Sequence, residues 1–540
     1  MVIAGLAALS RARMLQAALI AAFAALLVAA FTPPGGDMPA HLYRTLLVRE
    51  GVYLWDNLWF AGHYPLASYS LLYYLPAALV GNVPLVVASV LASAVLFDSV
   101  TRREWGAAAL WPSRVFAVLA AGPLFTGTYA YALGMTGLLA TLASLQRGRT
   151  GLAIACAALT LGFNPLAFLF LCLVLAAVLV VRRGVGGRPL LFAAGLAAAV
   201  SLEALALLLF PTDGRYPFRA IELLTVIAVS ALGAALALRA RGARVLAAFF
   251  VLWALASLLV FVVPDPVGEN VTRLRSVVFP LMLLAALLAG FKPRALAACG
   301  LALAVFYNVY PYAKHLTART DDTRPAAEQF WTPALAFLRA HAGANYRVEV
   351  VPTYDHWEAY WVPKAGFPLA RGWDRQIDIA ENGALYRKPL TPSAYRSWLR
   401  LMGVRYVLMP DVRIGEKGAD REARLLASGR SGLVEVFSTR NWRIFELPRP
   451  RPILSGPGPA SLARFSHDRI AGRIGRAGTY ALRVRYMPYW QVRRGRVCLQ
   501  RARNGMTLML VRRPGRFVLA TDSGPAALVR NAFSERRGTC

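Results

Sequence analysis

Residues 14–31 read MLQAALIAAFAALLVAAF, an apolar run without a charged residue that begins just after Arg11 and Arg13. A helix that crosses a bilayer needs about 20 mainly apolar residues in a row. Comparable runs follow at residues 151–181, 189–210, 245–263 and 276–290, and none follows beyond about residue 312. The sequence therefore predicts an α-helical polytopic membrane part followed by a water-soluble C-terminal part.

The composition agrees with lipid as the solvent of the first part. Of the 540 residues, 57% are hydrophobic and only 16% are charged, whereas ordinary soluble domains have about 25% charged residues. The formal net charge of +32 does not indicate nucleic-acid binding, because the basic residues show no helix-face clustering and no nucleic-acid-binding module accompanies them. Such a basic exterior suits anionic lipids or polymers better. Membrane lipids are therefore expected partners, and nucleic acid is not.

The short basic loops set the predicted topology. Arginine-rich clusters recur at residues 102–103, 147–149, 182–188, 239–244 and 292–294, while the alternate connections at 122–128, 163–165, 211–217 and 264–275 carry fewer basic residues. Basic loops stay on the cytoplasmic side, which gives about eleven spans in the plasma membrane. The first run is taken as a retained helix, and residues 69–80 as an interfacial or re-entrant piece. Residues 32–65 and everything beyond residue 312 then lie outside the cytoplasm.

The C-terminal part changes to alternating helices and strands. A helix is expected over residues 325–342 and strands over 346–351 and 404–409, and a Pro-rich linker follows at 448–459. Beyond the linker, alternating runs broken by Gly turns predict a β-sandwich. The predicted division is a transmembrane domain at residues 1–312, an extracytoplasmic α/β domain at 313–447 and a β-sandwich at 448–540.

The five cysteines show no CxxC pair and no metal-ligand spacing. Cys156, Cys172 and Cys299 fall in predicted membrane helices, where Cys serves as a small apolar residue. Cys498 and Cys540 lie in the predicted extracytoplasmic part, and whether they form a disulfide is left open.

The first outer loop concentrates ionisable and aromatic side chains. It reads PPGGDMPAH at residues 33–41 and WDNLWFAGHYP at residues 55–65. A loop that only connects two membrane spans needs no more than a few polar residues. This loop holds Asp37, His41, Arg44, Glu50, Trp55, Asp56, Trp59 and His63. Carboxylates beside Trp rings suit a polar site that binds a sugar, although an interfacial aromatic belt explains Trp55 and Trp59 equally well. Asp37 is different, because a carboxylate directly after a spanning helix usually has a function or a partner.

An acid shortly after the first span, then a short helix and a WDN…F.G.P stretch before a Pro-containing run, resembles the GT-C superfamily of membrane glycosyltransferases. The plan of many spans followed by an extracytoplasmic part resembles it too, and the sequence-specific likeness covers roughly residues 36–76. The resemblance implies an enzyme that transfers a sugar from a polyprenyl-phosphate carrier to a cell-envelope glycan or lipid acceptor. It also implies that Asp37 is the catalytic base. Because metal use varies within the superfamily, the resemblance implies no definite cofactor and leaves a divalent cation open.

The reaction explains why these residue types are needed. The acceptor hydroxyl attacks the anomeric carbon, so a carboxylate must take its proton, and direct displacement inverts that carbon. The leaving phosphate gains negative charge, so cationic groups should face it; Arg44, Arg273 and Arg275 are the candidates. Arg273 and Arg275 lie on the predicted outer side against the usual arginine bias, which a carrier phosphate explains. Headgroup contact, or pairing with Asp265 or Glu269, is the alternative.

Members of the superfamily often carry a second acid in another outer loop, for which Asp213, Asp265 and Glu269 are candidates. Two other functions stay open beside the transferase. One is a transporter or flippase of lipid-linked sugars, for which a single acid within a predicted span, Glu203, is thin support. The other is a non-catalytic membrane protein that binds cell-envelope glycan. The absence of a Walker motif, an HExxH motif and a nucleophile elbow disfavours ATP hydrolysis, zinc hydrolysis and serine acyl transfer.

The soluble part has one stretch that is dense in aromatic residues. It reads HWEAYWVPKAGFPLARGW at residues 356–373. Aromatic faces beside Arg and Asp are groups that bind carbohydrate, which makes Trp357, Trp361 and Trp373 candidates for glycan contact. A packed α/β core explains the same residues at least as well.

Overall fold

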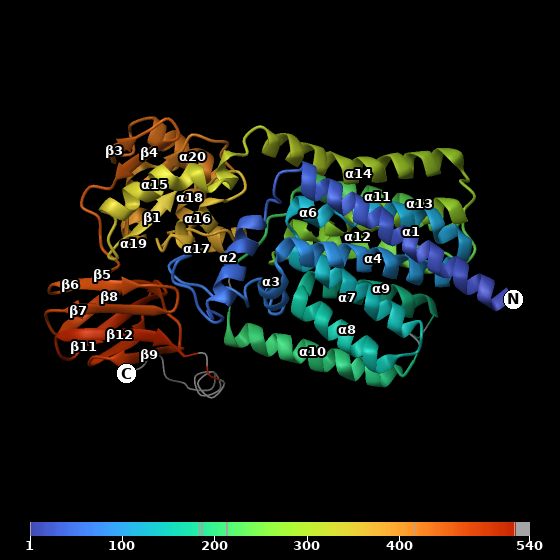
Figure 1. The fold of residues 1–540 in the computed structure, drawn as a ribbon, viewed down its shortest axis with the longest axis horizontal. Coiled ribbons are helices and arrows are strands. Elements are labelled where there is room, and N and C mark those ends of the chain that lie inside the picture. The colour runs from blue at the N-terminus through green and yellow to red at the C-terminus, as the bar shows by residue number, and fades with distance from the viewer. Residues whose placement is uncertain are drawn as a thin grey trace. The chain divides into compact units, whose positions relative to one another are not determined.

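The computed structural model describes residues 2–182, 184, 187–211, 214–415, 417–522 and 524. The chain divides into two compact units (Figure 1). The first unit comprises Met1–Gly35, Ser70–Ala206 and Arg215–Asp321, and the second comprises Gly36–Tyr69, Leu207–Gly214 and Asp322–Cys540. The first outer loop therefore belongs to the same unit as the soluble C-terminal part.

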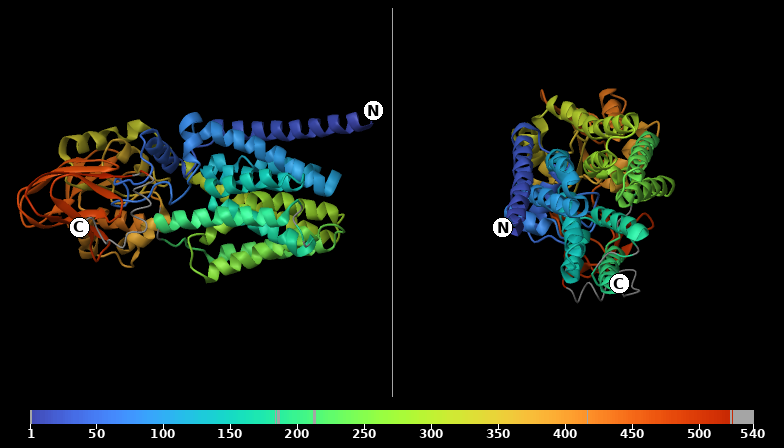
Figure 2. Two further views of the ribbon diagram at one scale, coloured as in Figure 1. Left: turned by 90° about the horizontal axis from the view of Figure 1, so that it is seen from below. Right: turned by 90° about the vertical axis from the view of Figure 1, so that its right-hand side faces the viewer.

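Apolar helices make up the first unit and run side by side as a bundle (Figure 2). They are α1 (Val2–Phe31), α3 (Tyr74–Val80), α4 (Asn82–Trp105), η1 (Gly106–Ala109), α5 (Leu110–Leu119), α6 (Gly122–Thr126), α7 (Tyr129–Leu145), α8 (Thr150–Phe163), α9 (Pro165–Arg182), α10 (Pro189–Leu209), α11 (Ala220–Leu238), α12 (Arg244–Val262), η2 (Gly268–Leu274), α13 (Arg275–Leu288) and α14 (Arg294–Thr320). Eight helical stretches among the described residues are long and apolar enough to cross a membrane, and α7 and α8 are shorter apolar helices. The protein is thus a multi-pass membrane protein, and the number of about eleven spans stays a prediction.

Two breaks in the apolar runs follow from the local sequence. Gly81, at φ +89°, ends the short helix α3 directly before α4, so residues 69–80 contain a separate short helix. Asn164 separates α8 from α9 with an extended backbone, because the residue before a proline avoids the helical region. Its side-chain oxygen accepts the Ala167 backbone N–H at 3.0 Å, and Pro165 fits the first position of the next helix.

Different connections of the helical unit lie at the two ends of α7. After the C-terminal end of α7, Arg147 donates through Nη2 at 2.8 Å to Ser99 Oγ in α4, close to Arg102 and Arg103 of the same helix. At the opposite end of α7, the Tyr131 hydroxyl donates to the Arg273 carbonyl at 3.2 Å. The acid-containing connection at residues 264–275 therefore lies at the opposite end of α7 from the basic connections.

Glycines let these helices approach one another closely. A Cβ at Gly137 in α7 would lie 2.5 Å from Thr160 Oγ1 in α8. A Cβ at Gly233 in α11 would lie 2.7 Å from the Phe250 ring in α12. Small residues at such positions are typical of helix contacts within a membrane, where close packing replaces the hydrophobic effect as the driving force.

The second unit begins, after the first loop, with a mixed α/β fold. Its sheet has the order β1-β2-β4-β3, in which β1 is parallel to β2 and the other pairs are antiparallel. The strands are β1 (Arg347–Val350), β2 (Val404–Pro410), β3 (Val434–Ser438) and β4 (Trp442–Glu446), and the helices are η3 (Arg324–Ala326), α15 (Glu328–His341), α16 (Glu358–Lys364), α17 (Arg375–Glu381), α18 (Gly383–Tyr386), α19 (Pro392–Met402) and α20 (Lys417–Ala427). The sequence sets the ends of α19, since Thr391 caps its start and Gly403 at φ +74° ends it.

Two four-stranded antiparallel sheets form the predicted β-sandwich. Their orders are β10-β11-β8-β5 and β6-β7-β12-β9. The strands are β5 (Leu454–Ser455), β6 (Ala460–Phe465), β7 (Arg469–Ile474), β8 (Gly478–Arg485), β9 (Trp490–Arg494), β10 (Val497–Arg501), β11 (Met506–Val511) and β12 (Gly515–Thr521). The predicted fold class is confirmed, and the domain boundaries at residues 312 and 447 stay predictions. Cys498 is buried in β10, and Cys540 lies outside the described residues, so whether the two form a disulfide stays open.

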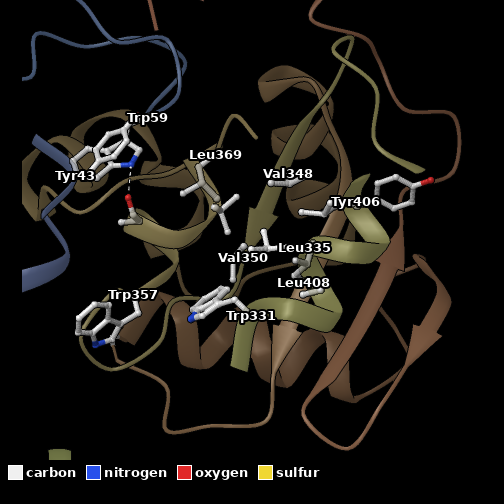
Figure 3. Packing of buried hydrophobic residues seen from close by; sticks show 14 of the residues in the cluster. Tyr43, Trp59, Trp331, Leu335, Val348, Val350, Trp357, Leu369, Tyr406 and Leu408 are labelled. Atoms are coloured by element: carbon white, nitrogen blue, oxygen red, sulfur yellow. Dashed lines mark hydrogen bonds between the residues drawn. The ribbon is translucent and has the colours of Figure 1, made fainter. Parts of the chain in front are cut away.

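The first outer loop supplies side chains to all three hydrophobic cores of the second unit. Tyr43, on α2 (Met38–Arg49), and Trp59 pack into the core that surrounds the mixed sheet (Figure 3). Trp55 belongs to the core of the sandwich. Ala61 belongs to the third core, with the buried side chains of α19. The loop is therefore an integral part of the soluble fold.

The substitution Trp59→Ala tests this integration. The Trp59 ring is 0% exposed, so its removal leaves a cavity, which costs about 3–5 kcal/mol for such a truncation. We expect the soluble unit to become protease-sensitive at a clearly lower temperature, as measured by thermal-shift proteolysis in detergent. Trp111→Ala, at a site that is 59% exposed, is the matched control and should change little. Equal effects of the two substitutions would contradict the packing role.

Candidate active site

Asp37 directly precedes α2 and begins that helix. Pro39 lies in the first helical turn, where its missing N–H removes no helical hydrogen bond. The Asp37 carbonyl accepts the His41 backbone N–H at 3.2 Å, and the buried His41 ring packs against Tyr69 with 5.6 Å between the ring centroids. The Asp37 side chain is partly exposed. The predicted base thus lies at the N-terminus of a helix, where negative charge is favoured.

Arg44 lies on the same helix and is fully buried. It forms an ion pair with Asp374, and its Nε donates to the Pro65 carbonyl at 2.9 Å. Its guanidinium lies 5.4 Å from the Trp59 ring centroid and 5.0 Å from that of Tyr69. These contacts give Arg44 a structural task within the second unit, and its predicted contact with carrier phosphate stays a prediction.

Asp56 is the centre of a buried polar network in the same loop. The Tyr43 hydroxyl donates to Asp56 Oδ2 at 2.9 Å, and His467 Nδ1 lies 2.9 Å from Asp56 Oδ1. The other ring nitrogen of His467 lies 3.3 Å from Glu50 Oε2, and His63 Nδ1 lies 3.8 Å from Asp56 Oδ2. The structure therefore gathers three ionisable residues of the first outer loop, Glu50, Asp56 and His63, near His467 of the sandwich. Local sequence patterns do not reveal His467.

The charges of this network follow from its geometry. Burial alone would raise the pKa of Asp56, but the hydrogen bond and attraction of His467 prevail and lower it. Burial likewise opposes protonation of His467, yet the bond to Asp56 raises the pKa of that imidazole. Burial lowers the pKa of His63, which stacks on Trp59 at 5.4 Å. Asp56 and His467 thus form a buried ion pair, and His63 packs beside it as a neutral ring.

The helical unit holds a polar cavity of about 220 Å³. Its walls come from the connection between α6 and α7, from η2, from the start of α13 and from the end of α14. The lining residues are Pro123, Thr126, Thr128, Tyr131, Tyr216, Glu269, Asn270, Thr272, Arg273, Arg275, Ser276, Pro311, Tyr312 and His315. The structure therefore brings the two predicted outer arginines, Arg273 and Arg275, to one cavity.

Neutral groups hold both arginines at this cavity. Arg275 donates through Nη2 to Thr272 Oγ1 at 2.7 Å, and its guanidinium lies 5.0 Å from the Tyr307 ring centroid. The backbone of Arg273 is held by the Tyr131 hydroxyl, which donates to its carbonyl. These contacts position the guanidinium of Arg275, and Arg273 lines the same cavity. Together with the nearby Thr and Tyr hydroxyls, the arginines can bind an anion that has several oxygens.

The candidates for a second acid differ in what they contact. Glu269 lines the cavity, but both of its carboxylate oxygens accept hydrogen bonds from Arg219 at 3.1 Å. Asp265 Oδ1 accepts two backbone N–H groups of the following turn at 2.7 and 2.9 Å, which is a structural role. Asp213 lies outside the described residues. Glu269, whose charge is matched by Arg219, is therefore the carboxylate found among the described residues that line the cavity.

The end of α14 contributes residues that the sequence analysis did not single out. Tyr312 and His315 line the cavity, and Arg319, one turn further on, donates to the Phe125 carbonyl at 2.6 Å. The three residues are spaced i, i+3 and i+7, which places them on one face of a helix. That spacing is the signal in the sequence that could have located these residues, because it places three polar side chains on one face of α14.

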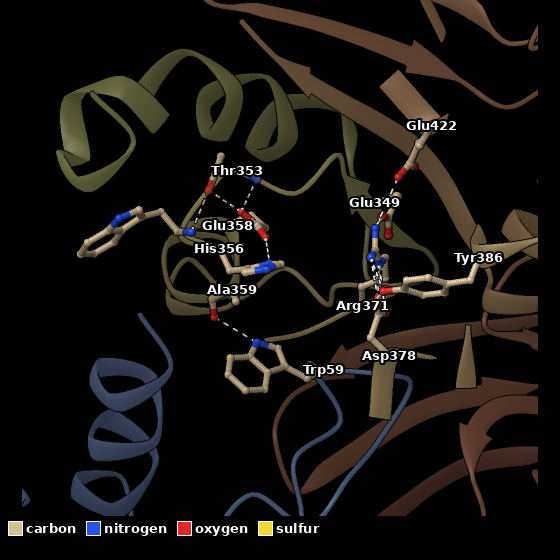
Figure 4. A network of polar contacts seen from close by, with 11 residues as sticks. Trp59, Glu349, Thr353, His356, Glu358, Ala359, Arg371, Asp378, Tyr386 and Glu422 are labelled. Atoms are coloured by element: carbon tan, nitrogen blue, oxygen red, sulfur yellow. Dashed lines mark hydrogen bonds and ion pairs between the residues drawn. The ribbon is translucent and has the colours of Figure 1, made fainter. Parts of the chain in front are cut away.

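The five tryptophan candidates for glycan contact differ in exposure. Trp55, Trp59 and Trp357 are buried at 3%, 0% and 6% exposure. The Trp59 Nε1 donates to the Ala359 carbonyl at 3.0 Å (Figure 4), as is usual for a buried indole. Trp361 and Trp373 are partly exposed. The first three serve packing in this structure, and the ring surface available to a glycan belongs to Trp361 and Trp373.

A buried arginine within the aromatic stretch at residues 356–373, Arg371, lies close to three carboxylates. Arg371 Nε donates to Asp378 Oδ1 at 3.0 Å, and its Nη1 lies 3.5 Å from Glu422 Oε2 and 3.8 Å from Glu349 Oε1 (Figure 4). Burial, with repulsion from the neighbouring carboxylates, raises the pKa of Glu349 well above its usual range. The same causes raise the pKa of Glu422 to about 7. Because all four side chains are at most 5% exposed, this network stabilises the α/β fold and is closed to a glycan.

Comparisons with known proteins can now be placed beside this geometry. No protein-family model and no curated protein matches the chain. Solved structures do. The Archaeoglobus fulgidus oligosaccharyltransferase in complex with Zn and sulfate is 10% identical, with 73% of this chain and 68% of that chain covered and a TM-score of 0.44. ArnT from Cupriavidus metallidurans bound to undecaprenyl phosphate is 13% identical, with 81% and 97% covered and a TM-score of 0.40, and its apo state scores 0.37 at 12% identity, with 82% and 98% covered.

Both neighbours are GT-C glycosyltransferases, the superfamily that the first outer loop resembles. At TM-scores below 0.5 the likeness assigns neither an activity nor a residue, so both rest on this chain's own side chains. For metal binding, no group of three or more His, Cys, Asp or Glu side chains within the described part of the chain is placed to hold an ion.

The Asp56–His467 ion pair predicts a specific pH dependence of stability. The raised pKa of His467 gives stability that is present at lower pH and is lost as pH rises through that pKa. The lowered pKa of Asp56 gives stability that is lost as pH falls through it. We expect the thermal stability of the wild type to exceed that of His467→Gln most strongly between the two pKa values.

Thermal unfolding of both proteins from about pH 4 to about pH 10 measures this difference. His341→Gln is the control, because His341 contacts a backbone carbonyl at 2.9 Å and no carboxylate in the contacts described. A stability gap for His467→Gln that stays constant across the whole range would contradict the ion pair.

Proposed function

We propose that the protein is a glycosyltransferase of the GT-C type. It moves a sugar from a polyprenyl-phosphate carrier to a cell-envelope glycan or lipid acceptor outside the cytoplasm. The observation that carries this proposal is the cavity with Arg273 and Arg275 at the end of the helical unit that is opposite the basic connections. A carrier of this kind has a long apolar chain and one charged end, which matches apolar helices that end in a cationic cavity.

The chemical step needs one base and one stabilised leaving group. The oxygen of the acceptor hydroxyl forms a bond to the anomeric carbon as the bond between that carbon and the phosphate oxygen breaks. The hydroxyl proton passes to the carboxylate of Asp37, the base that the resemblance to the GT-C superfamily implies. The bonding electrons leave with the polyprenyl phosphate, whose added negative charge Arg273 and Arg275 stabilise. Because the displacement is direct, the anomeric configuration inverts.

Asp37→Asn tests the base and the reaction class together. Transfer is measured with purified protein in lipid nanodiscs and a panel of polyprenyl-phosphate sugars. Loss of a general base lowers kcat by about 10²–10⁴-fold, and we expect a fall of that size with an intact fold. Asp420→Asn, at an exposed acid of α20, is the matched control and should keep full activity. Transfer that survives Asp37→Asn would keep the enzyme and remove Asp37 from its chemistry.

The rival transporter hypothesis is tested on the same preparation. A carrier or flippase needs no positioned base, so it would show no transfer from any donor and would move the lipid-linked sugar across liposomes. Such movement at equal rates in the wild type and in Asp37→Asn, without product formation, would replace the transferase proposal.

Arg273→Gln and Arg275→Gln test the phosphate site. Each variant removes a charge-assisted hydrogen bond worth about 1.5–3 kcal/mol, which corresponds to a fall in kcat/KM of about 10- to 100-fold. We expect Arg275→Lys to recover part of the activity, since it restores the charge without the planar fork. Arg239→Gln, at an exposed arginine of a basic connection, is the control. Transfer kinetics unaffected by either Gln variant would contradict this placement of the phosphate.

A further inference from the structure

A second cavity, of about 450 Å³, lies within the soluble unit. It is formed by the C-terminal half of α19, by the linker before the sandwich and by the sheet of β8 and β11. The lining residues are Ser397, Arg400, Leu401, Arg451, Ala481, Leu482, Arg483, Ala502, Asn504, Met506, Thr507 and Leu508. Its volume is within the range of cavities that bind small molecules in proteins.

Three arginines from three different segments line this cavity: Arg400 from α19, Arg451 from the linker and Arg483 from β8. The lining contains no Asp or Glu among the described residues. Isolated surface arginines are expected in a chain with a net charge of +32. Three arginines on one concave surface whose described lining has no carboxylate indicate anion binding more strongly than isolated arginines do, because they concentrate positive charge in a recess.

Neutral acceptors hold two of these arginines in place. Arg483 donates through Nη1 to the Pro452 carbonyl at 2.6 Å and to Ser455 Oγ at 2.8 Å. Arg400 donates through Nη2 to the Pro448 carbonyl at 3.1 Å. Arg400 also donates through Nε to the Arg449 carbonyl at 3.5 Å. All of these acceptors are neutral, and each guanidinium has further N–H donors for a ligand.

The clustered charges repel one another. Burial, together with the positive charge of Arg451, lowers the pKa of Arg483. Two charged groups placed in this way are relieved when an anion binds between them. The cavity is therefore preorganised for a group with several negatively charged oxygens, such as phosphate or carboxylate.

The rest of the lining indicates what carries the anion. Ser397 and Asn504 offer hydroxyl and amide groups, while Leu401 and Leu508, which are not fully buried, provide apolar surface. Sugars present hydroxyl groups and apolar C–H faces to such surfaces. A nucleotide base would need a stacking partner, and no aromatic residue lines this cavity in the described part of the chain.

We propose that this cavity binds an acidic saccharide, a sugar that carries a phosphate or carboxylate group. Arg400, Arg451 and Arg483 bind the acidic group, and the polar and apolar lining residues contact the sugar. This site shares no lining residue with the cavity that holds Arg273 and Arg275. Binding of a saccharide here does not depend on the protein being a transferase.

Calorimetric binding to the full-length protein in neutral phosphatidylcholine nanodiscs tests the site. The measurement is made at about 0.15 M salt, where diffuse attraction is screened. The probes are tetragalacturonate, glucose 6-phosphate, the neutral saccharide maltotetraose and inorganic phosphate. We expect one or both acidic saccharides to bind, and both maltotetraose and inorganic phosphate to bind at least tenfold more weakly, a gap of about 1.4 kcal/mol.

Variants separate the cavity from the general positive charge. The pair Arg400→Gln and Arg451→Gln removes two charges from the lining, and we expect at least a tenfold weaker affinity. Ala481→Phe fills the cavity from β8 without a change of charge and should weaken binding as much. The control pair Arg469→Gln and Arg473→Gln removes two charges from exposed positions of β7, outside the lining, and should leave binding unchanged.

The outcomes are decisive in either direction. Loss of binding in both cavity variants, with the control pair unaffected and the unfolding temperatures unchanged, supports the site. Equal weakening by the control pair shows general charge attraction and overturns the proposal. Failure of both acidic saccharides to bind overturns it too, and inorganic phosphate that binds as tightly as either saccharide overturns the assignment to a sugar. Transfer activity enters none of these results, so a failure here leaves the proposed function standing.

Discussion

Burial of the first outer loop in the cores of the soluble unit is the interaction on which the position of Asp37 depends. Burying one large apolar side chain contributes about 1.5–3 kcal/mol, and Tyr43, Trp55 and Trp59 are all buried. Arg44 adds a constraint, because a buried guanidinium is tolerated only with a partner, which Asp374 provides. Since Asp37 begins the helix that bears Tyr43 and Arg44, the packing that anchors α2 also determines where its carboxylate lies.

The helical unit supplies the complementary charge. Arginines normally collect at the cytoplasmic ends of spanning helices, and the sequence predicts that side for the arginine-rich connections of this chain. Arg273 and Arg275 lie at the opposite end and line a cavity with tyrosine, threonine and histidine side chains. Fixed charges that face a leaving phosphate lower the barrier without reorganisation during the reaction. Direct displacement from a carrier phosphate, the proposed reaction, requires a base for the acceptor hydroxyl and cationic groups that face the leaving phosphate.

Local patterns predicted those parts of the molecule that local forces determine. Apolar runs located the membrane helices, and Gly81 and the Asn164-Pro165 pair lie at two breaks between them. Contacts between distant residues could not be predicted in this way. Arg44 meets Asp374 across 330 positions, and Asp56 meets His467 across 411. Composition also could not distinguish a tryptophan that is buried in a core, such as Trp59, from one whose ring is partly exposed, such as Trp361, because both roles use the same side chain.

The most direct test of the central claim is an experimental structure of the protein in nanodiscs with a polyprenyl-phosphate bound. We expect density for the phosphate in the cavity of the helical unit, within hydrogen-bond distance of the guanidinium groups of Arg273 and Arg275. Phosphate density bound elsewhere, with both arginines in the contacts described here and the cavity filled by water, would contradict it.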